Sequence, residues 1–421
     1  MKLLLAGVTV LGLLMAGSTT LQPVAAGAPA QPKSNVQPEA TARRRPFPPE
    51  HGPLRVEGRQ FYDANNHVWR WRGASQFLLF ARYLNGEDIA PQLDWLIDRG
   101  FNVIRVFGEV PVGFRADQYG VPNYERPFER TDFDTKLHAF FTMLEERGLR
   151  CEYTVLTYSD ATDVMRTHVQ RVFDVAASHW NVFVETANEP EHNRIDAVAV
   201  MQGVDRHRVL SAYGLDPGRA KVDAWKTDVR VLDYGTAHDL QRDLEYSPSN
   251  TKNAVEMQNT FGIPFVNDEP IGAIDPGHKL FKQNGPGVWG GINGGGARTI
   301  NRDVFISAAA IAYMYSAGYT YHFQDGVEGR VPTLSHPVQD GVADALREVA
   351  KFLPGNLPLG VFVEPGRGDF GLATTSGYGV IVGNQQWVVV PTPPANWAAV
   401  PAKGWRIDAV GPVPYILRLS K

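Results

Sequence analysis

The sequence predicts an α/β protein, a (β/α)8 TIM barrel with an N-terminal β-hairpin and a small C-terminal β module. Between residues 71 and 353, eight short apolar runs alternate with segments of helical pattern. Such alternation indicates parallel strands connected by helices, and eight repeats are the number that closes a barrel. After residue 356 only short strand-like runs between glycine and proline turns remain. A length of 421 residues accommodates one large barrel with such additions.

The N-terminal segment has the features of an export signal. Residues 1–26 begin with Lys2, continue with an apolar stretch at 3–15 and end in small residues at 24–26. This order is typical of a signal peptide. A membrane anchor is the alternative, but the apolar stretch is short for a span. Residues 27–53, rich in Pro, Ala and Gln, predict a disordered linker, so we expect a secreted or periplasmic protein without a stable membrane span.

The predicted catalytic barrel covers residues 54–355. Residues 54–57 and 67–71 flank a turn at 63–66 and predict the hairpin. The predicted barrel strands are 71–76, 101–107, 149–157, 182–188, 209–212, 229–236, 263–268 and 319–324. The predicted helices are 88–99, 131–147, 162–180, 194–204, 250–260, 301–316 and 341–353.

Helix ends in the first half of the barrel carry recognisable signals. Gly100 follows the first predicted helix and Gly148 the second, each in the position of a C-terminal cap. The second helix starts at Thr131 and Asp132, which serve as N-terminal caps. These signals set the helix bounds, whereas the fifth and sixth strands rest on a weaker pattern.

Residues 356–421 predict a separate β module. Its strands are expected at 361–363, 378–382, 386–390 and 415–419. A carbohydrate-binding module is one interpretation. A structural cap on the barrel is the favoured one, because about 65 residues without a disulfide make a small independent core.

Composition excludes several classes of protein. A formal net charge of −4 and a pI of about 6.3 provide no electrostatic basis for a nucleic-acid partner. The single Cys151 cannot form an internal disulfide and, within a predicted strand, indicates a buried thiol. We expect no cofactor and no metal, because metal-ligand, esterase and nucleotide motifs are missing from the sequence. The GxGxxG at 285–290 lacks a preceding strand and an immediate helix, so it does not indicate a dinucleotide site.

Two glutamates at strand ends are the strongest functional signal. Glu189 and Glu269 each follow an apolar run and precede a proline. Catalytic groups of a (β/α)8 barrel stand at the carboxyl ends of its strands. Cleavage of a glycosidic bond requires two carboxyl groups, one to protonate the leaving oxygen and one to attack or to activate water. Asn188 could bind a sugar hydroxyl beside Glu189, and Arg105, an arginine in an apolar strand, needs a charged partner such as Glu269.

The chain resembles the clan A glycoside hydrolases, the superfamily that includes family 5 cellulases and mannanases. The resemblance covers about residues 54–325. It rests on FYD at 61–63 with WRGAS at 71–75, GFNVIRV at 100–106, ANEP at 187–190 and PFVNDE at 264–269. It implies hydrolysis of a β-linked oligo- or polysaccharide with retention of configuration, with Glu189 as acid/base and Glu269 as nucleophile.

Other parts of the pocket follow the clan less closely. The clan often places a tyrosine and a histidine after the sixth strand, which suggests Tyr234 and His238 as pocket residues. The eighth strand usually ends in a tryptophan that lines the first sugar site, where this chain offers His322 or Phe323. Tyr158 and Asp160 after the third strand, and Trp289 in the loop after the seventh, are further candidates for sugar contacts.

Three functions stay open at this point. The first is a secreted retaining glycoside hydrolase. The second is a non-catalytic carbohydrate-binding barrel in which the C-terminal module is the working part, which the departures in the eighth strand suggest. The third is a transglycosylase, which uses the same two carboxyl groups and cannot be separated from a hydrolase by sequence.

Overall fold

The structure is a computed structural model, and it describes most of the chain after residue 50. The described residues are 51–109, 126–215, 232–237, 255, 257–268, 272–273, 302–323, 337–366, 368–374, 377–390, 396–411, 413 and 415–421. The predicted signal peptide and the linker up to residue 50 lie outside them. The last linker residues, 51–53, contact the barrel, since the carbonyl of Gly52 accepts a hydrogen bond from Arg150 Nη2 at 2.8 Å. No described helix is long and apolar enough to cross a membrane.

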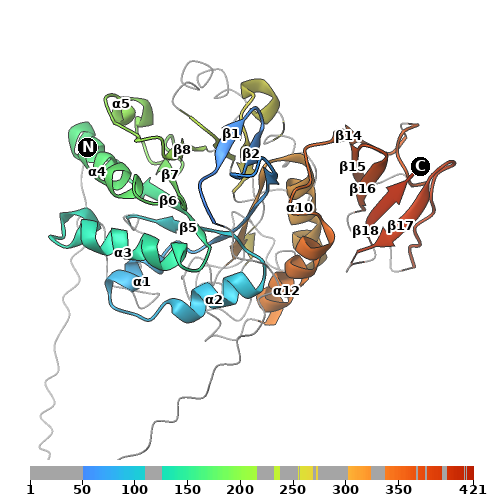
Figure 1. Cartoon of the computed structure of the whole chain (residues 1–421), viewed down its shortest axis with the longest axis horizontal. Coiled ribbons are helices and arrows are strands. Elements are labelled where there is room, and N and C mark those ends of the chain that lie inside the picture. The colour runs from blue at the N-terminus through green and yellow to red at the C-terminus, as the bar shows by residue number, and fades with distance from the viewer. Residues whose placement is uncertain are drawn as a thin grey trace, which may run out of the picture. The chain divides into compact units, whose positions relative to one another are not determined.

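Parallel strands form an eight-stranded barrel, which confirms the predicted fold class (Figure 1). The fifth barrel strand is interrupted at Tyr213 and appears as two short strands, of which β8 pairs with β7 and β9 with β10. One residue separates the two pieces, so the ring closes there. The barrel strands are β4 (Trp71–Ser75), β5 (Val103–Phe107), β6 (Arg150–Leu156), β7 (Val182–Ala187), β8 (Leu210–Ala212), β9 (Gly214–Leu215), β10 (Gly235–Ala237), β11 (Phe265–Asn267) and β13 (Gly318–Phe323), and the short β12 (Gly272–Ala273) pairs with β13.

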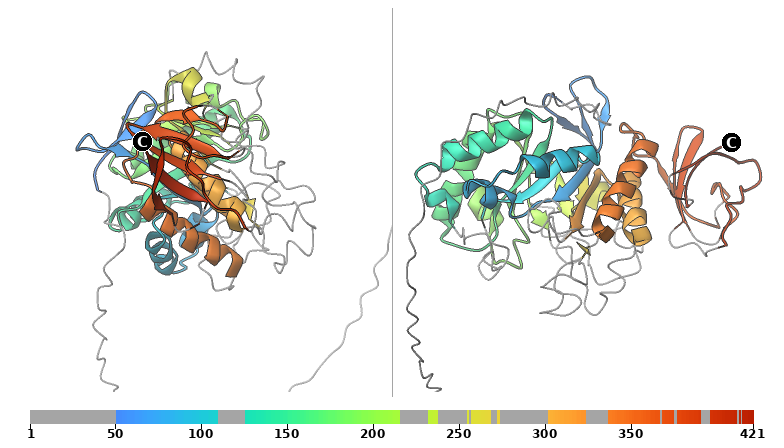
Figure 2. Two further views of the ribbon diagram at one scale, coloured as in Figure 1. Left: turned by 90° about the vertical axis from the view of Figure 1, so that its right-hand side faces the viewer. Right: turned by 90° about the horizontal axis from the view of Figure 1, so that it is seen from below.

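Helices cover the outer side of these strands (Figure 2). Helix α4 illustrates why: its buried residues Met165, Val169, Val172, Phe173 and Ala176 recur at helical spacing and form one apolar stripe. Helix α1 was not predicted from the sequence. The labelled helices are α1 (Leu79–Leu84), α2 (Ala90–Asp98), α3 (Phe133–Glu145), α4 (Thr162–Ala176), α5 (Ala197–Met201), α10 (Arg302–Tyr315) and α12 (Pro337–Phe352), with the 3-10 helix η2 (Pro127–Glu129). Residues 257–261, within the helix predicted at 250–260 and one residue beyond it, are also helical.

A small antiparallel sheet packs against the amino-terminal end of the barrel. It contains β1 (Arg55–Glu57), β2 (Gln60–Tyr62) and β3 (Val68–Trp69), in that order. The two predicted hairpin arms therefore both pair with β2 and not with each other. This arrangement buries Phe61 completely, and its ring lies 5.8–6.1 Å from those of Trp69, Trp71, Phe183 and Tyr234. These aromatic rings fill the interior of the barrel at its amino-terminal end.

The C-terminal residues form a five-stranded antiparallel sheet with the order β14-β15-β16-β18-β17. Its strands are β14 (Val361–Val363), β15 (Tyr378–Val382), β16 (Gln385–Val389), β17 (Arg406–Val410) and β18 (Ile416–Ser420). The edge strand β17 was not predicted. The sheet contacts α10, where the Tyr315 hydroxyl donates a hydrogen bond of 2.6 Å to the carbonyl of Gly379. The C-terminal sheet therefore packs against a barrel helix, and the interpretation of the module as a structural cap stays a prediction.

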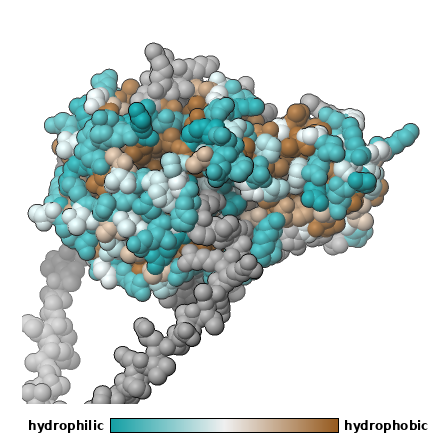
Figure 3. All heavy atoms as spheres, in the orientation of Figure 1, coloured by the Kyte–Doolittle hydropathy of each residue, from teal (hydrophilic) through white to brown (hydrophobic). Residues whose placement is uncertain are grey.

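The described part of the surface exposes few large hydrophobic side chains. In the face drawn in Figure 3, hydrophilic residues cover most of the barrel and hydrophobic ones show in separate patches. Among the described residues, the large hydrophobic side chains that are exposed all belong to the C-terminal part: Val361, Phe362, Val400 and Val410. Strands β14 and β17 lie at opposite edges of their sheet, so Val361 and Val410 do not form one patch.

Gly318 permits the close pairing of the first and last barrel strands, and Gly318→Ala is expected to destabilise the protein. A Cβ there would lie 2.1 Å from the carbonyl oxygen of Trp71 and 2.5 Å from its Cβ. Because backbone and a buried ring must move, we expect a loss of about 1–3 kcal/mol in unfolding free energy, measured by urea denaturation. Gly368→Ala is the matched control, since no atom lies within 4 Å of its added Cβ. Equal stability of the two variants would contradict the close contact.

Candidate active site

The peptide that carries Glu189 forms a tight turn at the carboxyl end of β7. Glu189 has a φ of 42°, in the left-handed region that non-glycine residues rarely occupy. Asn193 holds the turn, because its backbone N–H donates to the Glu189 carbonyl at 2.9 Å and its side chain to the Asn188 carbonyl at 2.7 Å. The Asn188 N–H in turn donates to Leu156 at the end of β6. Backbone strain of this kind clusters at functional sites, where it holds a side chain in a required orientation.

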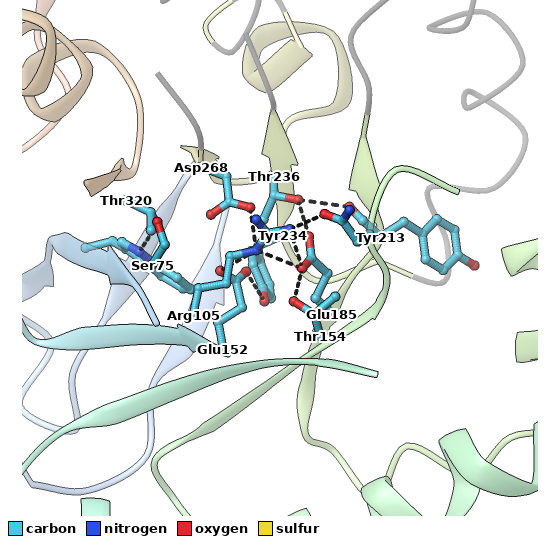
Figure 4. Close-up of polar contacts among 12 residues, drawn as sticks. Ser75, Arg105, Glu152, Thr154, Glu185, Tyr213, Tyr234, Thr236, Asp268 and Thr320 are labelled. Carbon is cyan, nitrogen blue, oxygen red and sulfur yellow. Dashed lines mark hydrogen bonds and ion pairs between the residues drawn. The ribbon is translucent and has the colours of Figure 1, made fainter. Parts of the chain in front are cut away.

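Arg105 lies at the centre of a buried polar network inside the barrel (Figure 4). Its Nη2 donates to Asn188 Oδ1 at 2.8 Å and to Glu185 Oε2 at 2.9 Å. Its Nε lies 2.9 Å from Asp268 Oδ2 and 3.8 Å from Glu152 Oε2. Arg105 and the three carboxyl groups are completely buried. The predicted need of Arg105 for a charged partner is thus met by three acidic side chains, none of which was predicted.

The neighbours of the three carboxyl groups differ. Glu185 accepts hydrogen bonds from the hydroxyls of Thr154 and Thr236, the latter at 3.0 Å. Glu152 Oε1 accepts one from the Tyr234 hydroxyl at 3.0 Å. Burial, followed by the charges of Asp268 and Glu185, raises the pKa of Glu152 well above its ordinary value. Burial also raises the pKa of Tyr234, so its hydroxyl stays protonated and can donate.

The same three carboxyl groups could be considered as metal ligands. One oxygen of each of Glu152, Glu185 and Asp268 lies within 4.8 Å of the others. The guanidinium of Arg105, however, contacts two of them at 2.9 Å and supplies there the positive charge that a cation would supply. The arrangement therefore fits an ion-pair network better than a metal centre.

The described residues include about half of the predicted site. Arg105 and Asn188 contact each other beside Glu189, and Tyr158 lies half-buried after β6. Tyr234 lies inside the barrel among the aromatic rings, below the strand ends. The remaining predicted site residues, Glu269, His238 and Trp289, lie outside the described residues, and His322 is described only as part of the backbone of β13.

A second buried ionisable pair was also missed from the sequence. Glu109, two residues after β5, lies 3.1 Å from His168 Nδ1 on α4, and both side chains are buried. The His168 ring stacks on Phe128 at 4.2 Å. Burial raises the pKa of Glu109, partly offset by its hydrogen bond with His168. The signal was a histidine within the apolar stripe of a helix, facing an acidic residue just beyond a strand end.

These features define a class of protein: a TIM barrel with an arginine and acidic side chains gathered in its interior, and with Glu189 and Asp268 just after the carboxyl ends of two strands. No protein family and no curated protein matches the sequence. Among solved structures, a protein of Bacteroides vulgatus provisionally named a glycoside hydrolase is similar, with a TM-score of 0.57 and 12% identity over 88% of this chain and 82% of that one. At that identity the likeness shows the fold.

Two further structures are similar at lower scores. A β-1,4-mannanase from the sea hare Aplysia kurodai has a TM-score of 0.46 and 11% identity over 73% of this chain and 99% of its own. A β-glucanase from Saccharophagus degradans, in complex with cellotetraose, has a TM-score of 0.47 and 14% identity over 73% and 98%.

Proposed function

We propose that this protein is a secreted, retaining glycoside hydrolase that cleaves β-linked glycosides. The observation that carries the proposal is the strained turn at Glu189, which stands at a barrel strand end next to an asparagine held by Arg105. A barrel of this class places its reactive groups there, and a glycosidase needs a carboxyl group in that position. The fold likeness to the Bacteroides vulgatus protein is in keeping with this assignment.

The proposed reaction is a double displacement. Glu269, directly after Asp268, attacks the anomeric carbon while the protonated carboxyl of Glu189 gives its proton to the leaving oxygen. The ionised Glu189 then removes a proton from water, which attacks the glycosyl–enzyme ester and releases Glu269. Arg105 keeps Asn188 in place for a sugar hydroxyl. We assign Tyr234 a role in supporting Glu152 and not in binding sugar, because its hydroxyl donates a hydrogen bond to Glu152 inside the barrel.

Glu189→Ala tests the acid/base assignment. The variant is expected to lose about 10²–10⁴-fold in kcat/KM on a β-glycan, whose leaving oxygen needs a proton, and much less on aryl glycosides with acidic leaving groups. Glu146→Ala, at an exposed glutamate after α3, serves as the matched control and should keep wild-type rates. A loss of equal size on both substrate types would contradict the role of Glu189 as an acid.

The stereochemistry of the first product tests the two-step mechanism. Proton NMR of the nascent reducing sugar is expected to show the β-anomer, and an α-anomer would contradict retention. The same assay with an added alcohol acceptor separates hydrolysis from transglycosylation, since a transglycosylase would form the alkyl glycoside as its main product.

A further inference from the structure

The contacts of Glu152 are those of a neutral acid and not of a carboxylate. Its Oε1 accepts from Tyr234, while its Oε2 has no hydrogen-bond partner among the described residues. The cation that faces it, Arg105, is 3.8 Å away, whereas the contacts of Arg105 with Glu185 and Asp268 are 2.9 Å. A fully buried carboxylate without close compensation is expensive, so a group so placed keeps its proton.

The charges around Glu152 also favour its protonated form. It faces Arg105 on β5, Glu185 on β7, Asp268 after β11 and the Tyr234 hydroxyl before β10. Two of these groups are acidic, and oxygens of all three carboxyl groups lie within 4.8 Å of one another. A proton on Oε2 would neutralise Glu152 and so remove its repulsion with the negative charges of Glu185 and Asp268.

We propose that Glu152 is a positioning residue that stays protonated in the working enzyme, so that the positive charge of Arg105 remains paired with Glu185 and Asp268. Arg105 then holds Asn188, and with it the turn that carries Glu189. The catalytic consequence rests on the proposed glycosidase function. The protonation itself does not, because it is a property of the folded protein without substrate.

Ionisation of Glu152 would have a definite effect. A third carboxylate would compete for Arg105 and weaken its hydrogen bond to Asn188, so activity is expected to fall as pH rises through the raised pKa of Glu152. The sign for stability follows from the raised pKa of Glu152. Its contribution is fully present below the ordinary glutamate value and is lost as pH rises through the folded-state pKa.

The test compares Glu152→Gln with Glu185→Gln, the same chemical change at two members of one network. Glutamine resembles a protonated carboxyl, so Glu152→Gln is expected to keep kcat/KM within about threefold and to retain activity to higher pH than the wild type. Glu185→Gln removes the charge that pairs with Arg105 and is expected to lose more than about tenfold.

Infrared spectroscopy reads the proton directly. At neutral pH, the difference between the wild-type and Glu152→Gln spectra should contain the C=O stretch of a protonated, buried carboxyl group, because bands from other protonated carboxyl groups, such as that of Glu189, cancel. Absence of that band from the difference spectrum, a Glu152→Gln protein that fails to fold, or an activity loss as large as that of Glu185→Gln would each overturn the proposal. If the band behaves as expected but no variant or wild type cleaves a glycoside, the proposed function fails while the protonation of Glu152 stands.

Discussion

Replacing Glu269 by alanine is expected to abolish turnover, with a loss of at least about 10⁴-fold, more than removal of a general acid or base costs, because the nucleophile itself is removed. The covalent route disappears with the carboxylate, because the glycosyl–enzyme ester of the proposed mechanism forms on Glu269. The cavity left by the side chain should admit azide, which would restore turnover of an activated aryl glycoside as a glycosyl azide of inverted configuration. The measurements are the release of the aryl group with and without azide and NMR of the product.

Asp268 is the alternative candidate for the nucleophile, and the azide experiment distinguishes it from Glu269. It directly precedes Glu269, is completely buried and lies 2.9 Å from Arg105. We expect Asp268→Gly to lower activity by disturbing Arg105 and to be insensitive to azide, because a buried, ion-paired carboxylate has no access to a sugar. Full activity of Glu269→Ala, or azide rescue of Asp268→Gly in its place, would move the nucleophile to Asp268.

Replacing Arg105 by methionine is expected to have the largest effect on stability. It leaves Glu185 and Asp268 buried without this cation, and breaking such a buried pair costs about 3–5 kcal/mol. It also removes the hydrogen bond to Asn188, so activity should fall in whatever protein still folds. Urea denaturation gives the stability change, and glycoside hydrolysis at a temperature where the variant is folded gives the activity change.

Two comparisons make the Arg105 result specific. Arg406→Met, at an exposed arginine paired with Asp408, should change stability little, because surface ion pairs contribute little. Arg105→Lys keeps a positive charge at this position and should lose less stability than Arg105→Met, because Glu185 and Asp268 keep a cation nearby. Equal losses in the two variants would indicate lost packing in place of lost charge pairing.

Much of the fold followed from local patterns. The strand predicted at 182–188 is observed as Val182–Ala187, and the helix predicted at 131–147 as Phe133–Glu145. Where the pattern was weak the structure differs: the fifth strand breaks at Tyr213, and the N-terminal arms pair with β2. Register across a small sheet depends on which side chain is buried, here Phe61, and a hairpin pattern does not carry that information.

In the candidate site, too, some residues could be predicted from local sequence and others could not. A strand end followed by Glu-Pro is a local signal, and it identified Glu189 and its neighbour Asn188. Arg105 was recognised as needing a charged partner, but its partners were missed. A glutamate within an apolar strand, such as Glu152 or Glu185, could equally face the helices or the barrel interior until the strands are assembled.

The sequence by itself determined the barrel, the order of its strands and the position of the candidate acid at a strand end, because apolar periodicity, caps and turns act over a few residues. Only the tertiary structure decided which charges meet inside the barrel. Arg105, Glu152, Glu185 and Asp268 come from four separate parts of the chain, and their contacts depend on closure of the ring. The energy of a buried charge depends on all the neighbours within a few ångströms, so its protonation and its partners become defined only when those strands come together.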